Sequence, residues 1–252
     1  MKPSPLTVLL LACATVSMPC RSGAEPVSSE TPFPSAQQLL QDVRASLPRE
    51  PLRISGELLV RRRHGLDSRR YGFEAELRLG DSPASAQYRI FDDRGVELEA
   101  LTAALRLAEA PDLAYTAGGV AAEAPPLSAA IQSTDLTWMD LTLSFLWWHG
   151  GTVLREEEIK GRACYVVELP APGGSVTVGG SGYAGVWLWV DAELHMLLQA
   201  EGREAQGQPL RRLWIKSLKK IDDRWMIKDM EVEKFPTTQR TKLHVREVET
   251  TE

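Results

Sequence analysis

The C-terminal third of the chain alternates between short apolar runs and short polar segments, as consecutive antiparallel strands do. Five runs of strand length are separated by two to six polar or glycine-rich residues. A parallel return between strands would need a crossover of roughly a dozen residues or more, so we expect hairpins. The expected strands are residues 183–191, 194–203, 210–221, 224–235 and 240–249.

The N-terminal half predicts one helix followed by a meander of strands. Ser35 is a suitable N-cap for a helix that reaches about residue 46, and Pro48 follows its end. Beyond this helix, apolar residues recur at every second position, as they do in strands with one buried face. Four antiparallel strands are expected there, at residues 54–60, 71–79, 86–91 and 96–101.

The middle of the chain predicts a long loop and then an aromatic helix. Residues 103–131 are rich in Ala, Gly and Pro, which leaves open short helical or strand segments around a long loop. For this loop we favour a surface loop over the alternative of a mobile lid. A helix capped by Ser133, Thr134 or Asp135 should follow, because its large apolar residues recur at spacings of three to four. These residues are Trp138, Leu141, Phe145 and Trp148.

Two further strands, at residues 152–159 and 163–169, bring the count to about eleven and predict a mainly β (α+β) fold. The chain has no internal repeat, and a single domain over residues 35–252 is enough for its length. Cys164 lies among apolar neighbours in the second of these strands, so we expect a buried structural thiol.

The first residues predict export. Residues 6–18 are apolar apart from Thr and Ser, a run that is too short to span a bilayer but suits a signal peptide. We expect a signal peptide over residues 1–24 with cleavage after Ala24, and a flexible leader over residues 25–34. Lipid anchoring through Cys13 or Cys20 stays open as an alternative.

Charge argues against nucleic acid as a partner. The formal charge of −5 becomes −7 when residues 1–24 are removed, because Lys2 and Arg21 are lost and no acid is. Nucleic-acid affinity depends on clustered Lys and Arg that neutralise phosphates. The basic clusters at residues 61–63 and 69–70 are interpreted as a solvated hairpin end, with docking to an anionic membrane or an acidic partner as the alternative.

No motif in the sequence indicates catalysis, a metal or a cofactor. Ser181 precedes a strand, whereas the nucleophilic serine of α/β-hydrolases lies on a strand-to-helix turn. The glycines of residues 173–182 are not followed by a helix, which argues against a phosphate-binding loop. The four histidines, His64, His149, His195 and His244, lack the spacing of zinc ligands. We therefore expect a non-enzymatic protein with no catalytic residue, metal site or cofactor.

The sequence feature that does point to a function is a set of apolar residues. Residues 186–190 are apolar on both alternating faces, so one face can pack under a helix while the other must meet more core or a ligand. The candidates for lining a lipid-binding cavity are Trp138, Leu141, Phe145, Trp148, Trp187, Trp189 and Trp214. The alternative, that the tryptophans simply fill a core, stays open.

Three passages, in this order along the chain, resemble the outer-membrane lipoprotein-sorting proteins, the LolA-like periplasmic carriers. They are STDLTWMDL at residues 133–141, GVWLWVD at residues 185–191 and TTQRT at residues 237–241. The similarity is best from about residue 134 to residue 248. It implies a half-open antiparallel β-barrel with helices over its concave side.

The resemblance also implies a function. A LolA-like protein would shelter the acyl chains of lipoproteins, or another lipid, in an apolar cavity during transport through the periplasm toward the outer membrane. Its partners would be an inner-membrane transporter and an outer-membrane acceptor, and we expect a monomer. The helix at residues 138–148 and the loop at residues 114–126 are the candidates for a lid. The alternative is an envelope sensor or scaffold that uses the same fold to bind a protein partner.

Overall fold

The computed structural model describes residues 33–61, 69–174, 176–178, 181–221, 224–237 and 239–251. Phe33–Glu252 form one compact unit. The expected signal peptide with Cys13 and Cys20, most of the expected leader, and the basic residues 62 and 63 lie outside the described residues. No helix in the described part of the chain is long and apolar enough to cross a membrane.

Thirteen antiparallel strands form one open sheet in the order β6-β5-β4-β3-β2-β1-β15-β14-β13-β12-β11-β8-β7. In chain order they are β1 (Leu52–Arg61), β2 (Arg69–Arg78), β3 (Ala84–Phe91), β4 (Glu97–Leu105), β5 (Asp112–Ala117), β6 (Val120–Ala122), β7 (Thr152–Ile159), β8 (Arg162–Pro170), β11 (Gly185–Asp191), β12 (Leu197–Arg203), β13 (Pro209–Ile221), β14 (Arg224–Lys234) and β15 (Arg240–Thr250). A separate two-stranded sheet pairs β9 (Val176–Val178) with β10 (Ser181–Tyr183), after the short 3₁₀ helix η2 (Pro172–Gly174).

The mainly β fold and the run of C-terminal hairpins are confirmed. Strands β11 to β14 each pair with the next strand in the chain, and β15 pairs with β1 to join the two halves of the sheet. The main sheet has two more strands than expected, because residues 103–131, expected to form a surface loop, contain β5 and β6. The sequence leaves short strand segments open there without locating them, because small residues dominate the region and give no clear alternation.

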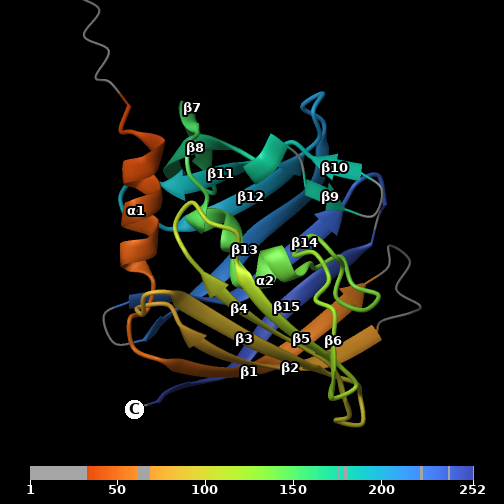
Figure 1. The fold of residues 1–252 in the computed structure, drawn as a ribbon. Coiled ribbons are helices and arrows are strands. Elements are labelled where there is room, and N and C mark those ends of the chain that lie inside the picture. Colours follow the sequence, from red (N-terminus) through yellow and green to blue (C-terminus); the bar gives the residue numbers. More distant parts are fainter. Residues whose placement is uncertain are drawn as a thin grey trace, which may run out of the picture. The chain divides into compact units, whose positions relative to one another are not determined.

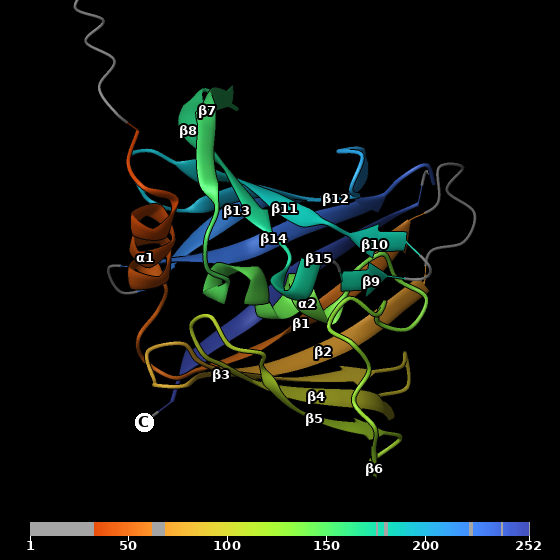
Figure 2. The ribbon, with the colours of Figure 1, turned by 45° about the horizontal axis from the view of Figure 1, so that its top comes forward.

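The sheet curves around the short helix α2 (Trp138–Thr142), and the helix α1 (Ala36–Ser46) lies across one side of it (Figures 1 and 2). Ser35 caps α1 as expected, since its side chain accepts a hydrogen bond from the Gln38 amide at 3.1 Å. The helix buries Leu39, Leu40 and Val43 in the main core. Helices therefore cover the concave side of the sheet, as the resemblance implied.

The expected single helix over residues 138–148 is wrong, because it is broken at Leu143. The α-helix α2 ends there, Leu143 takes a left-handed conformation with φ of 48°, and a 3₁₀ helix η1 (Ser144–Trp147) follows. Apart from Leu143, every residue from Trp138 to Trp148 is buried. The break turns the chain so that this piece, here named the inner segment (residues 138–148), fits inside the curved sheet.

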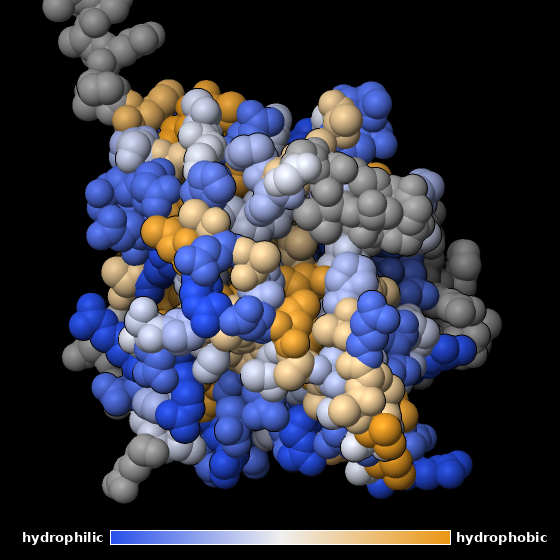
Figure 3. Space-filling model, in the orientation of Figure 1, coloured by the Kyte–Doolittle hydropathy of each residue, from blue (hydrophilic) through white to orange (hydrophobic). Residues whose placement is uncertain are grey.

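The two faces of the sheet differ in chemistry. Alternate residues of β1 and β2, such as Ile54 and Phe73, belong to the main core on the concave side. The convex face carries cross-strand ion pairs, including Arg53 with Glu76 at 3.0 Å. The surface seen in Figure 3 is mostly polar, with apolar patches over the region where Figure 1 places α2.

Gly202 in β12 is required by the close approach of an aromatic ring. A Cβ at this position would lie 1.5 Å from Cε1 of the buried Tyr183. We expect Gly202→Ala to lower the free energy of unfolding by about 1–3 kcal/mol, because the ring must move. Urea unfolding measures this loss. The control is Gly72→Ala, whose Cβ would meet Phe91 at an ordinary 3.6 Å; similar losses in both variants would contradict the explanation.

Candidate functional site

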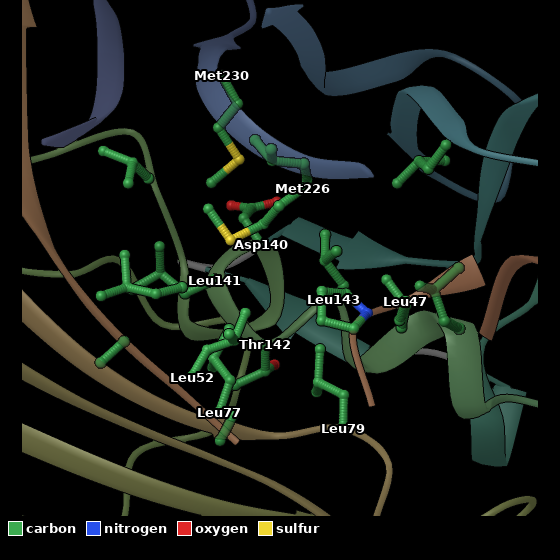
Figure 4. A pocket seen from close by; sticks show the side chains of 18 of the residues that line it. Leu47, Leu52, Leu77, Leu79, Asp140, Leu141, Thr142, Leu143, Met226 and Met230 are labelled. Carbon is green, nitrogen blue, oxygen red and sulfur yellow. The ribbon is translucent and has the colours of Figure 1, made fainter. Parts of the chain in front are cut away.

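An apolar cavity of about 110 Å³ lies between the concave face of the sheet, the end of α1 and the inner segment. Figure 4 shows Leu52, Leu77 and Leu79 on one side of it and Met226 and Met230 on the other, with the inner segment between them. We name this hollow the main cavity. Its wall also includes the side chains of Asp140 and Thr142.

Small residues in the strands leave this space open. Leu52 and Ile54 of β1 lie opposite Leu77 and Ala75 of β2, and Leu77 in turn lies opposite Ala86 of β3. All five residues point to the concave side, because opposite residues of antiparallel strands share a face. Ala75 lies between Ile54 and Tyr88, and Ala86 lies beside Leu77, so these two short side chains hollow the sheet between longer ones.

Hydrogen bonds tie the inner segment to the walls of the main cavity. The Tyr88 hydroxyl donates to the carbonyl oxygen of Leu141 at 2.7 Å, and the Arg44 guanidinium of α1 donates to that of Leu146. Burial raises the pKa of Tyr88 well above its ordinary value, so this phenol stays a donor at physiological pH. These donors satisfy carbonyl groups that two such short helices leave unpaired.

A buried ion pair holds the start of the inner segment. Thr137 and Asp140 form a capping box, in which the Asp140 carboxylate accepts from the Thr137 amide at 2.7 Å. The Arg211 guanidinium projects from β13 on the concave side, pairs with the same carboxylate and donates to the carbonyl oxygen of Asp135. Both charged side chains are less than a tenth exposed.

A second buried carboxylate fixes the chain just before α2. The Thr241 hydroxyl of β15 donates to Asp135 at 3.0 Å and accepts from the Asp135 amide at 2.9 Å, while Gln239 donates to the other carboxylate oxygen at 3.3 Å. Burial raises the pKa of Asp135, although these hydrogen bonds and the charge of Arg211 act in the opposite direction. We name Asp135, Asp140, Arg211 and Thr241 the polar anchor.

The structure separates the predicted cavity residues into two groups. Leu141 lines the main cavity, and Trp138, Phe145 and Trp148 lie in the adjoining core. The other three residues lie on the convex face and do not line the main cavity; they are Trp187, Trp189 and Trp214.

Each convex-face tryptophan has partners of its own. Trp189 packs in a small outer cluster with Cys164 and Val166. The ring of Trp187 lies 3.6 Å from the Arg203 guanidinium carbon, and the ring of Trp214 lies 5.6 Å from that of Arg240. The inward face of β11 is instead the one that carries Val186, Leu188 and Val190.

Sequence reasoning missed most of the cavity wall. The alanines that hollow it, Ala75 and Ala86, were expected only as ordinary positions of strands with alternating polarity. The methionines of β14, Met226 and Met230, were not singled out. The usable signal was the alternation over residues 71–79, which places Phe73, Ala75 and Leu77 on one face.

Cys164 and Ser217 are two groups in the described part of the chain that could act as nucleophiles. Burial, with a smaller effect of the Asp191 charge, raises the pKa of the buried Cys164 thiol to about 11. Ser217 and His244 contact opposite oxygens of the Asp229 carboxylate, so this serine has a carboxylate rather than an imidazole as its partner. Within the described residues, no cluster of His, Cys, Asp and Glu could hold a metal ion.

Three solved structures share this architecture. A DUF1329 family protein from Desulfovibrio piger superposes with a TM-score of 0.70 at 16% identity, covering 85% of this chain and 91% of its own. A LolA superfamily protein from Nitrosomonas europaea superposes with a TM-score of 0.68 at 17% identity, and the match covers 87% of this chain and 95% of that protein. A domain from Vibrio parahaemolyticus, described as a putative outer membrane lipoprotein-sorting protein domain, superposes with a TM-score of 0.68 at 16% identity. The match covers 84% of this chain and 91% of that domain.

These likenesses define the class: the chain has the LolA-superfamily fold, which confirms the resemblance found in the sequence. No curated protein matches the sequence. A family model matches residues 124–252, half of the chain, and its description is of a family of uncharacterized proteins. The chain belongs to this family.

The Arg211–Asp140 pair should be essential for stability. We expect Arg211→Met to lower the free energy of unfolding by about 3–5 kcal/mol, because Asp140 is then left buried without its counter-charge. Urea unfolding measures the loss. Arg53→Met, which removes an exposed ion pair with Glu76, should cost at most about 1 kcal/mol. Equal losses in the two variants would refute the role of the buried pair.

The raised pKa of Asp135 predicts that its contribution to the stability of the protein depends on pH. Its contribution to stability is fully present below its ordinary pKa of 3.8 and is lost as the pH rises through the higher folded value. The stability of wild type relative to Asp135→Asn should therefore fall as the pH rises from about 4. Unfolding at a series of pH values measures this difference, and a difference independent of pH would contradict it.

Asp229→Asn provides a control, because the stability that Asp229 contributes should depend on pH in the opposite direction. Burial alone would raise the pKa of Asp229, but hydrogen bonds from Lys242, Ser217 and His244 outweigh it and lower the pKa. The stability that Asp229 contributes is present above its ordinary pKa of 3.8 and is lost as the pH falls through the folded value. Wild type relative to Asp229→Asn should therefore lose stability on acidification.

Proposed function

We propose that this protein is a non-enzymatic carrier that shelters acyl chains of lipoproteins, or of another lipid, in the main cavity. The observation that carries the proposal is the apolar hollow between α1, the inner segment and the sheet. A hydrocarbon chain gains about 0.8 kcal/mol for each CH₂ removed from water, so it needs only an apolar, accessible space. The LolA-superfamily fold is consistent with a binding role of this kind.

The size of the main cavity suggests how a chain is taken up. Its volume of about 110 Å³ is smaller than the roughly 150 Å³ of an engineered protein cavity that binds benzene. A long acyl chain therefore requires the walls to move. The inner segment is the part that moves in this proposal, since its two helices are short and Leu143 separates them. Met196, Met226 and Met230 are flexible wall residues that adapt to different chains.

The cellular setting also belongs to the proposal. The apolar run at residues 6–18 supports export by a signal peptide, and a lipid carrier of this kind would work in the periplasm as a monomer. An inner-membrane transporter would load it and an outer-membrane acceptor would unload it. Those two partners follow from the function proposed, since cargo must be supplied at one membrane and accepted at another.

Filling the main cavity should weaken the binding of a fatty acid there. Ala86 is buried in its wall, so we expect Ala86→Phe to occupy the space and weaken binding of a dansyl-labelled fatty acid by tenfold or more. Fluorescence titration measures the affinity, and mass spectrometry of gently purified wild type should detect co-purified lipid. The matched control is Ala104→Phe, on the opposite face of the sheet.

Two outcomes would overturn the proposal. One is a wild-type protein that is reproducibly empty and does not bind the dansyl probe. The other is equal weakening of binding by Ala86→Phe and Ala104→Phe, since the position of the added ring would then be irrelevant. Circular dichroism and urea unfolding establish that both variants are folded before affinities are compared.

A further inference from the structure

A second apolar pocket, of about 370 Å³, adjoins the inner segment and is not part of the main cavity. Residues of the inner segment divide between the two hollows. Leu141, Leu143 and Leu146 line the main cavity, whereas Met139, Ser144 and Trp148 line the second pocket. Trp147 lines both. The inner segment therefore separates the main cavity from the second pocket.

Most of the remaining wall of the second pocket comes from the end of β4, the turn that follows it, β5 and the chain before α2. It includes Leu105, Leu113 and Leu127. The Ala108 amide in that turn donates to the carbonyl oxygen of Trp147 at 2.9 Å. This hydrogen bond fixes the turn against the inner segment, so the pocket is built from joined elements.

One polar group in this wall lacks a partner. Ser144 is only 4% exposed, and among the described residues its hydroxyl makes no hydrogen bond. A buried polar group without a partner destabilises the fold, so such a group is unusual in a folded protein. The hydroxyl oxygen itself has almost no exposed surface, so a ligand in the second pocket reaches it only after a small shift of the Ser144 side chain or of its neighbours. A hydrogen-bond acceptor on that ligand would then satisfy this hydroxyl.

The charges around the pocket indicate which hydrogen-bond acceptor of a ligand fits beside Ser144. Arg106 is the one arginine or lysine in the wall, and its guanidinium is held by Asp112. Glu109 also lies in the wall, and its negative charge opposes an incoming carboxylate. His149 is the remaining titratable group there. An uncharged carbonyl oxygen therefore fits Ser144 better than a free fatty acid does.

We infer that the second pocket binds an acyl chain whose ester or amide carbonyl accepts a hydrogen bond from the Ser144 hydroxyl. The inference rests on the proposed function and extends it, because it assigns acyl chains to both sides of the inner segment. The chain in the second pocket is either another chain of the lipid in the main cavity or a chain of a second lipid molecule.

The test uses methyl laurate, a neutral acyl ester, and native mass spectrometry of the full-length protein. Wild type should bind two ester molecules. Ala86→Phe, which fills the main cavity, should retain one, and Ala110→Trp, at the exposed rim of the second pocket, should retain the other. Dioleoylglycerol, which has two ester-linked chains, then identifies the source: one molecule per protein means that both chains belong to one lipid, and two molecules mean separate lipids.

Ser144→Ala tests the carbonyl contact. This variant should weaken methyl laurate binding in the second pocket roughly tenfold in the Ala86→Phe background, the effect of one lost hydrogen bond. The affinity for laurate, the free acid, should be weak and should not change when Ser144→Ala is added. The substitution should also raise the melting temperature of the ligand-free protein, because an orphaned hydroxyl is removed. Ser85→Ala, on the convex face, is the matched control and should alter neither affinity.

The outcomes separate this inference from the proposed function. One bound ester in wild type and none in Ala86→Phe would overturn the second site while leaving the main cavity as the carrier site. Unchanged ester affinity in Ser144→Ala, or equal affinities for ester and free acid, would overturn the carbonyl assignment. A wild type that binds neither ester nor dansyl probe would refute the proposed function as well.

Discussion

The buried pair of Arg211 and Asp140 is the contact on which the interior arrangement depends. A curved sheet with an open edge on each side leaves a concave apolar face that must be covered. The cover is an α-helix of five residues and a 3₁₀ helix of four, both too short to be stable alone. Their position must therefore come from tertiary contacts, and Arg211 supplies a charge and a carbonyl contact at the point where the cover begins.

The polar contacts of the inner segment are unevenly distributed along it. The polar anchor is concentrated at the start of the segment, around Asp135 and Asp140. Farther along, Leu143 and Leu146 face the main cavity, and the carbonyl groups of Leu146 and Trp147 accept the hydrogen bonds described above. Strong contacts at one end fix the register of the segment, while its apolar side chains are left to form cavity walls.

Local pattern predicts the strands well but does not predict which face of the sheet is concave. Alternation with period two places Phe73, Ala75 and Leu77 together, and the structure confirms it. For β11, both faces are apolar, so sequence alone could not decide that Val186 points inward and Trp187 outward. Curvature comes from the packing of all thirteen strands, which no single strand encodes. The break at Leu143 was equally hidden, because a left-handed leucine gives no compositional signal comparable to glycine.

Two of the three passages that carried the resemblance meet in one structural contact of this chain. Asp135 and Asp140 of STDLTWMDL, and Thr241 of TTQRT, meet in the polar anchor that holds the inner segment against β13 and β15. The family match over residues 124–252 contains this anchor but not β1, β2 or β3. Those strands supply Ala75 and Ala86, the residues that hollow the wall. The matched region thus contains the contacts that hold the cover, whereas the wall of the main cavity is shared between this region and the strands that precede it.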